Sequence, residues 1–190
     1  MNFIIILVLA LANTFQSNNK QNLQEYQFKS GMIRYKLEGR INGTELIYFD
    51  DYGKSFYDLK TIDNDDSRSE NITLRILRAD TILILNNIEN AATESVISDL
   101  RLKTKHNIIY PELLFEMGYK KTAVEEVSGT LCDKYTGENG SMWVWNNIIL
   151  KSEMEIMGIV VKSEAVEIIT GIDIPKTKFQ ISGDYKINKQ

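Results

Sequence analysis

Cysteine and histidine, the residues that most often carry nucleophilic or metal chemistry, each occur once among the 190 residues. Cys132 lies in a β-like stretch, and His106 lies far from it in a polar stretch. A catalytic thiolate needs a cationic or histidine neighbour, and a zinc site is built mainly from cysteine and histidine ligands. A single cysteine also excludes an intramolecular disulfide. The sequence therefore predicts a structural, buried Cys132, no metal site and no Cys/His catalysis.

Neighbouring acidic residues could suggest carboxylate chemistry, and they occur at positions 50–51, 65–66 and 125–126. A glycosidase holds its two carboxyl groups several ångströms apart across a cleft, and the fold rather than the sequence brings them together. The acidic stretch 63–70 also differs from a calcium-binding EF-hand loop. Such a loop needs a glycine where Arg68 stands and a glutamate where Leu74 stands. We therefore expect a solvated loop, no catalytic residues and no cofactor.

The residues with a remaining functional interpretation are apolar. Trp143 and Trp145 fall on one face of a predicted strand and Met142 and Val144 on the other, because side chains alternate along a strand. Two interpretations are open: these side chains pack in the core, or they line a pocket for an apolar ligand beside a short helix at 111–117. Ligand pockets are mostly apolar with few polar groups. The candidate ligand-binding residues are Trp143, Trp145, Leu113, Leu114 and Met117.

The helix that would complete this pocket has clear end signals. Pro111 suits the first helical position, Glu112 favours the positive N-terminal end, and Gly118 suits the C-terminal cap. A helix of two turns is not stable alone, so it must pack on a sheet. Residues 91–102 are a second, ambiguous helical segment.

Most other segments show the period-2 pattern of strands. Ile33, Tyr35 and Leu37 alternate with charged residues, and Asn42-Gly43 is a strong hairpin-turn signal. Later strands are predicted at 45–49, 55–61, 72–76, 81–85, 127–135, 141–145, 148–151, 154–161, 166–174 and 178–181, with a loop at 162–165. The sequence predicts a mostly β (α+β) fold with one antiparallel sheet of roughly nine or ten strands and one or two short helices.

The N-terminus predicts export. Residues 3–12 form an uninterrupted apolar run that is too short to span a bilayer and that ends in polar sequence. We expect a signal peptide at 1–17, a single domain at 18–190, a periplasmic or secreted location, and no integral membrane segment after signal removal. The net charge of -4 and the lack of a basic cluster argue against a nucleic-acid partner.

Five segments together resemble a group of exported, uncharacterised bacterial envelope proteins of the Bacteroidetes type. They are residues 30–36, 46–53, 117–121, 129–132 and 143–153. This group is similar in outline to the LolA/LppX periplasmic lipoprotein-carrier superfamily. The resemblance implies a LolA-like half-barrel with short helices on its concave side and an apolar cavity for acyl chains. It supplies no catalytic residues.

Two functional hypotheses follow. The first is non-enzymatic binding of a lipid or other apolar small molecule in the half-barrel. The second is a protein–protein accessory or sensor module of the cell envelope, which would have a packed core and an exposed binding patch.

Overall fold

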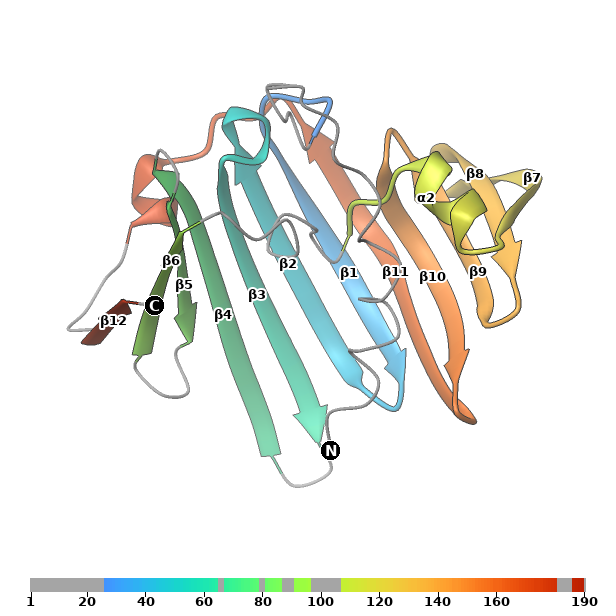
Figure 1. The fold of residues 1–190 in the computed structure, drawn as a ribbon, viewed down its shortest axis with the longest axis horizontal. Coiled ribbons are helices and arrows are strands. Elements are labelled where there is room, and N and C mark those ends of the chain that lie inside the picture. The colour runs from blue at the N-terminus through green and yellow to red at the C-terminus, as the bar shows by residue number, and fades with distance from the viewer. Residues whose placement is uncertain are drawn as a thin grey trace.

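A computed structural model describes residues 26–64, 67–78, 81–86, 91–96, 107–180 and 186–189. Within these residues, twelve strands form one sheet in the order β12-β6-β5-β4-β3-β2-β1-β11-β10-β9-β8-β7 (Figure 1). The strands are β1 Gly31–Gly39, β2 Asn42–Asp50, β3 Ser55–Asn64, β4 Ser67–Arg78, β5 Thr81–Asn86, β6 Ala91–Val96, β7 Lys120–Val127, β8 Thr130–Gly137, β9 Gly140–Trp145, β10 Ile148–Ile156, β11 Ile159–Thr170 and β12 Lys186–Lys189.

The sheet is open and curved, and all of its strand pairs except β12–β6 are antiparallel. The predicted fold class, a mostly β chain with one curved antiparallel sheet, is confirmed. The sheet has more strands than expected, because β6 and β12 at one edge and β7 at the other were not predicted. Three register shifts lie between Arg34 and Tyr35, between Ile149 and Lys151, and between Lys121 and Ala123. A β-bulge increases local twist, so these shifts contribute to the curvature.

The two halves of the chain meet where β1 pairs with β11. Ile33, Tyr35 and Leu37 of β1 are buried, whereas Arg34 and Lys36 are exposed, so the alternation seen in the sequence places one face of β1 in the core. The central core cluster contains Tyr26, Ile33, Tyr35, Leu37, Ile47, Phe49, Phe56, Val127, Cys132, Trp143, Ile148, Leu150 and Ala165. Tyr26 stacks on Phe49 with 3.8 Å between ring centroids, which ties the first described residue to β2.

Two short helical segments pack on the sheet at different places. Helix α2, Pro111–Glu116, lies over β8 and β9 at one end, and it starts at Pro111 as predicted (Figure 1). The 3₁₀ helix η4, Lys176–Phe179, packs against β3 and β4, where Phe179 contacts a cluster that includes Leu74. A strand was predicted at 178–181, and this prediction is wrong, because the chain turns after Pro175, which can donate no ladder hydrogen bond.

Three turns lie elsewhere than predicted. Asn42-Gly43 belongs to β2, and the β1–β2 turn contains Arg40 and Ile41; the Asn42 side chain instead accepts a hydrogen bond from the Gly39 N–H. The predicted loop at 162–165 lies inside β11, because the turn falls at Met157 and Gly158, both with positive φ. The acidic loop is shorter than 63–70, since β3 continues to Asn64 and β4 begins at Ser67.

The ambiguous helix at 91–102 is not formed at its start. Residues Ala91–Val96 are strand β6, which pairs with β5 in an antiparallel ladder. Pairing with β5 gives the backbone N–H and C=O groups of this segment hydrogen-bond partners. A short helix without packing partners would be only marginally stable. The rest of that segment and the predicted signal peptide lie outside the described residues. Among the described residues no helix is long and apolar enough to cross a membrane.

A third short helical segment, the 3₁₀ helix η2 at Asp51–Gly53, connects β2 to β3. The Asp50 side chain accepts a hydrogen bond of 2.7 Å from the Asp51 N–H and so caps this segment. This segment occupies the gap between the strands predicted at 45–49 and 55–61 and takes the form of one helical turn.

The β8–β9 hairpin provides a test of the sheet geometry. Gly140 has φ +137, and a Cβ atom there would lie 2.0 Å from the carbonyl oxygen of Glu153 on β10. We expect Gly140→Ala to lower the free energy of unfolding by about 2–4 kcal/mol, because backbone atoms must move. Gly129→Ala is the matched control: φ is +77 but nothing lies within 4 Å of the added atom, so the cost should be only about 1 kcal/mol. Denaturant unfolding followed by circular dichroism measures both, and equal losses would contradict the close approach.

Candidate functional site

The structure does not bring the five predicted ligand-binding residues to one wall. Along β9, Met142 and Val144 pack in a cluster with Leu114 of α2, whereas Trp143 belongs to the central core cluster. Trp143 and Trp145 do share a face, as expected from strand alternation. The helix, however, packs on the opposite face of β9. The expectation that the tryptophans and α2 enclose one pocket is therefore corrected, and the ligand-binding role of the individual residues stays a prediction.

The two tryptophans have different surroundings. Trp143 is buried in the central core cluster, and Trp145 is partly buried and stacks on Phe28 with 4.9 Å between ring centroids. Leu114 is fully buried. Trp143 and Leu114 thus pack against other side chains of the protein. This agrees with core packing, one of the two interpretations that the sequence left open.

Apolar side chains are exposed on both flanks of α2. With 3.6 residues per turn, Leu113 and Met117 fall on one flank and Phe115 on the other, while Glu112 and Glu116 lie on the side opposite the buried Leu114. Phe115 is 55% exposed, and Leu113 and Met117 are 39% exposed each. Together with the half-exposed Tyr110 just before the helix, these residues form what we call the α2 surface (Tyr110, Leu113, Phe115 and Met117). Only Leu114 of this helix is buried, because a helix of six residues has one side toward the sheet. Exposed apolar patches mark contacts with lipid, ligand or protein.

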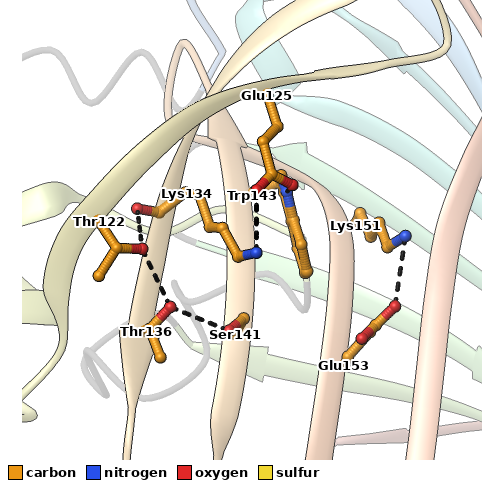
Figure 2. A network of polar contacts seen from close by, with 8 residues as sticks. All are labelled: Thr122, Glu125, Lys134, Thr136, Ser141, Trp143, Lys151 and Glu153. Carbon is orange, nitrogen blue, oxygen red and sulfur yellow. Dashed lines mark hydrogen bonds and ion pairs between the residues drawn. The ribbon is translucent and has the colours of Figure 1, made fainter.

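Trp143 is also the centre of a polar network across β7 to β10, shown in Figure 2. Its Nε1–H donates a hydrogen bond of 2.7 Å to Glu125 Oε2, and Lys134 Nζ lies 3.0 Å from Glu125 Oε1. Lys134 Nζ and Lys151 Nζ lie 4.7 and 5.0 Å from the centroid of the Trp143 ring. Both lysines are the cross-strand neighbours of Trp143, so the sheet register sets this arrangement. Cations at these distances are attracted to the indole face.

Lys151 extends the network toward the centre of the sheet. Its Nζ lies 3.3 Å from Glu153 and 3.1 Å from Glu164. Toward the other side, the hydroxyls of Thr122, Thr136 and Ser141 form a chain with spacings of 3.1 and 3.0 Å. The charges alternate in sign and each has a partner within the chain. Because the carboxylate and amino groups neutralise one another, this network orders side chains across five strands, β7 to β11.

A second polar group is buried on β1 to β3, and we call it the buried polar cluster (Tyr26, Tyr35, Glu45, Asp58 and Asn107). The register places Glu45 opposite Tyr35 and Asp58 opposite Ile47. Tyr26 Oη donates a hydrogen bond of 3.1 Å to Asn107 Oδ1, and Tyr35 Oη donates one of 2.9 Å to the Ile149 carbonyl oxygen. The cluster therefore connects the first described residue, the connection before α2 and four strands, β1, β2, β3 and β10.

The carboxyl groups of this cluster have perturbed electrostatics. Burial, and then the negative charge of Glu45, raise the pKa of Asp58 to about 7, while Lys60 acts against the rise. Lys60 Nζ lies 3.1 Å from Glu45 Oε1 and so neutralises the other carboxylate. Burial also raises the pKa of Tyr35. Asp58 Oδ1 and Asn107 Nδ2 are buried and have no hydrogen-bond partner in the described part of the chain.

Sequence reasoning missed this cluster, although a signal for it existed. Glu45 is two positions before Ile47, and Asp58 is two positions after Phe56, so both occupy the buried phase of their strands. Charged residues in that phase are rare unless they are paired. Glu45 and Asp58 are not adjacent in sequence, and cross-strand pairing brings them together.

Two other kinds of candidate group are the Cys132 thiol and side chains that could bind a metal ion. Burial raises the pKa of the Cys132 thiol to about 11, so the thiolate that would react is disfavoured. In the described ranges, no group of three or more histidine, cysteine or acidic side chains could hold a metal ion.

The Trp143 hydrogen bond is open to a direct test. The bonds from Trp143 and then from Lys134 lower the pKa of Glu125. Trp143→Phe keeps an aromatic ring but removes the N–H donor, so we expect the pKa of Glu125 to rise toward its ordinary value. Lys134→Met should raise it less, because the Trp143 bond is the larger cause. Carbon-detected NMR titration of the glutamate carboxyls measures both, and an unchanged Glu125 in Trp143→Phe would refute the contact.

Asp58 should make stability fall as pH rises. Its folded pKa of about 7 lies above its ordinary value of 3.8, so the protonated form stabilises the folded state, fully below pH 4 and progressively less up to pH 7. We expect the unfolding free energy of the wild type relative to Asp58→Asn to fall by roughly 2–4 kcal/mol across that window. Asp173→Asn, at an exposed aspartate, is the matched control. Denaturant unfolding at a series of pH values measures the difference, and parallel curves for wild type and Asp58→Asn would contradict the burial of this carboxyl.

Comparison with known proteins indicates a fold but no family. No family model and no curated protein matches the sequence. Among solved structures, an uncharacterized conserved protein from Thermus thermophilus is similar over 85% of this chain and 91% of its own, with a TM-score of 0.54 and 9% identity. MucB is similar over 84% of this chain and 59% of its own, with a TM-score of 0.49 and 11% identity. The first likeness shows a shared fold, and the resemblance to Bacteroidetes-type envelope proteins stays a prediction.

Proposed function

We propose that this chain is an exported, non-catalytic binding protein for a lipid or other apolar ligand, which it receives on the α2 surface. The observation that carries the proposal is the exposure of Leu113 and Phe115 on α2 and of Met117 at its C-terminal cap, beside the single buried helix residue, Leu114. Three exposed apolar side chains on so short a helix are costly in water unless something covers them. Covering them transfers apolar area out of water, which is the main driving force for lipid binding.

The α2 surface is held rigidly enough to act as a site. Leu114 packs with Ile109, Tyr119, Tyr135, Met142 and Val144. The ring of Phe115 contacts that of Tyr135 edge-on, with 5.8 Å between centroids. The helix ends in hydrogen bonds from the Met117 N–H to the Leu113 carbonyl oxygen and from the Tyr119 N–H to the Leu114 carbonyl oxygen. The exposed side chains are thus presented on a fixed backbone, which reduces the ordering cost of binding.

The absence of catalysis in this proposal is supported by the environment of the polar groups. The Trp143 network consists of mutually neutralised charges, and Asp58 and Glu45 are shielded from solvent. The proposed periplasmic or secreted location is supported by the apolar run at 3–12, and a LolA-like half-barrel by the single curved sheet.

A protein–protein accessory module of the cell envelope is the second candidate. It is favoured by the packing of Trp143 and Leu114, which fills two positions that an internal lipid pocket would leave open. In that case the α2 surface would receive an apolar side of a protein partner rather than an acyl chain.

The two candidates are separated by a binding experiment with a defined probe. A fluorescent fatty acid is titrated into the wild type and into the double variant Leu113→Gln/Phe115→Gln. We expect binding by the wild type and a loss of roughly tenfold or more in affinity in the variant, because two apolar contacts are removed. Met157→Gln, at the exposed β10–β11 turn, is the matched control and should bind like the wild type.

Each contrary result has a distinct meaning. Wild-type protein that takes up no fatty acid, and that carries no ligand in native mass spectrometry after purification from the cell envelope, would overturn lipid binding. Equal fatty-acid affinity in the wild type and the double variant would show that the binding site is not on α2. A crosslinked envelope protein that the double variant loses, without fatty-acid uptake, would establish the second candidate.

A further inference from the structure

The turn between β10 and β11 carries an apolar side chain at a position that usually takes a polar one. Ile156 pairs with Ile159, so the loop between them has two residues, Met157 at φ +54 and Gly158 at φ +76. Positive φ at both positions is typical of a type I′ turn, which favours asparagine, aspartate or glycine first. Met157 stands there instead and is 83% exposed.

Two other two-residue turns of the same sheet follow the usual preference. The β7–β8 turn has Ser128 and Gly129 at φ +49 and +77, and the β9–β10 turn has Asn146 and Asn147 at φ +48 and +66. Each has a small polar side chain first. A left-handed backbone is unfavourable for a methionine, and exposure of its apolar side chain to water adds a further cost. The turn geometry therefore does not explain Met157, which indicates a role for its side chain.

The hairpin that ends in Met157 is apolar on both of its faces near the turn. Ile156 is 38% exposed and Val160 is 42% exposed. Val160 pairs with Glu155, which precedes Ile156 in the same strand. Because neighbouring side chains in a strand point to opposite faces, Ile156 and Val160 lie on opposite faces of the hairpin.

The β1–β2 turn lies beside this hairpin at the same end of the sheet (Figure 1). The Arg40 N–H donates a hydrogen bond of 3.0 Å to the Val160 carbonyl oxygen, which ties the two turns together. This turn adds Ile41, which is 38% exposed. The exposed apolar residues of the two turns form what we call the hairpin tip (Ile41, Ile156, Met157 and Val160).

The order of charges along the hairpin limits how deep such a tip can enter a bilayer. The pair nearest the turn, Ile156 and Ile159, is apolar, and the second pair contains Glu155. The fourth pair consists of Glu153 and Lys162. A strand rises about 3.4 Å per residue, and interfacial segments bury their apolar side about 5–10 Å deep. The turn and the first pair can thus enter while the charged residues stay at the head groups.

Arg40 supplies a cation at the base of the tip. It is exposed, and among the residues that the structure describes it forms no ion pair. A guanidinium group matches the geometry of a phosphate and binds it through two hydrogen bonds. Every phospholipid carries a phosphate next to its acyl chains, so Arg40 complements a bilayer that has no net charge. The net charge of -4 of the whole chain gives no long-range attraction to anionic lipids.

We propose that the hairpin tip docks this protein on the surface of a phospholipid bilayer, with Met157 and Ile41 among the upper acyl-chain segments and Arg40 at the phosphates. A protein partner or a second copy would cover one face of the hairpin, whereas a bilayer surrounds a tip on both faces. The driving force is the burial of apolar area. The tip is separate from the α2 surface, and uptake of a single fatty acid at α2 does not involve Met157.

Vesicle flotation tests the proposal. Protein purified from the cell envelope is mixed with phosphatidylcholine vesicles, with and without phosphatidylglycerol, in about 0.1 M and about 0.5 M salt. We expect the wild type to bind phosphatidylcholine alone, with a partition coefficient that salt changes by less than about twofold, because apolar burial is not screened. Met157→Asn should lower this coefficient roughly tenfold, since one apolar side chain no longer enters the bilayer. Leu131→Gln, at a 68% exposed residue beside the β7–β8 turn, is the matched control and should bind like the wild type.

The same substitution separates docking from folding. Asparagine is favoured at the first position of a type I′ turn, so Met157→Asn should raise the denaturant midpoint of unfolding while it lowers vesicle binding. A purely structural role for Met157 would give a lower midpoint instead.

Three results would overturn the proposal. The first is wild-type protein that does not float with vesicles. The second is equal vesicle binding by the wild type and Met157→Asn, and the third is binding that requires phosphatidylglycerol and disappears in about 0.5 M salt. Leu113→Gln/Phe115→Gln should bind vesicles like the wild type, and a loss of vesicle binding in that variant would assign the membrane contact to the α2 surface rather than to the hairpin tip.

Discussion

The pairing of β1 with β11 is the interaction on which the rest of the structure depends. It joins residues 31–39 to residues 161–170, and so holds strands β1–β6 and strands β7–β11 in one sheet. Hydrogen bonds continue the junction past both ends: the Arg40 N–H donates to the Val160 carbonyl oxygen at 3.0 Å, and Ser30 Oγ donates to the Ile172 carbonyl oxygen at 2.7 Å. Without this junction each half would have an additional free edge and half of the central core cluster. The cost of closing so long a loop is offset by burial of Ile33, Tyr35 and Ala165 along the junction.

The same junction determines which side chains are available for function. In the strands that follow it, side-chain alternation separates Trp143 and Leu150 in the central core cluster from Met142 and Ile149 in the cluster against α2. The side of the helix toward the sheet is filled by Leu114, and the apolar residues still exposed lie on the two flanks of the helix. The buried polar cluster follows from the register as well, because only the pairing of β1, β2 and β3 places Tyr35, Glu45 and Asp58 on one face.

Local patterns in the sequence predicted the elements that depend on interactions between residues close in sequence. The alternation of Ile33, Tyr35 and Leu37 predicted β1, and Pro111 with Gly118 predicted α2, because these signals act within a few residues. The turn predicted at Asn42-Gly43 lies earlier in the chain. Strand β1 ends at Gly39, which pairs with Val161 of β11, and the Asn42 side chain caps the turn by accepting a hydrogen bond from the Gly39 N–H. The shared face of Trp143 and Trp145 was predictable from period 2. The face on which α2 packs was not, because it depends on strand neighbours distant in sequence.

The end of the sheet formed by β7 to β9 concentrates the surfaces that face outward. Helix α2 leads directly into β7: Gly118, at φ +84, ends the helix, and Tyr119 packs with Leu114 before Lys120 begins the strand. A ligand on the α2 surface would thus act on a segment that adjoins the first strand of this end of the sheet. Tyr119 is the link, because its backbone N–H bonds to the Leu114 carbonyl oxygen and its hydroxyl lies 3.6 Å from Met154 Sδ. A shift of α2 would therefore be transmitted to the first residues of β7 and to Met154 on β10.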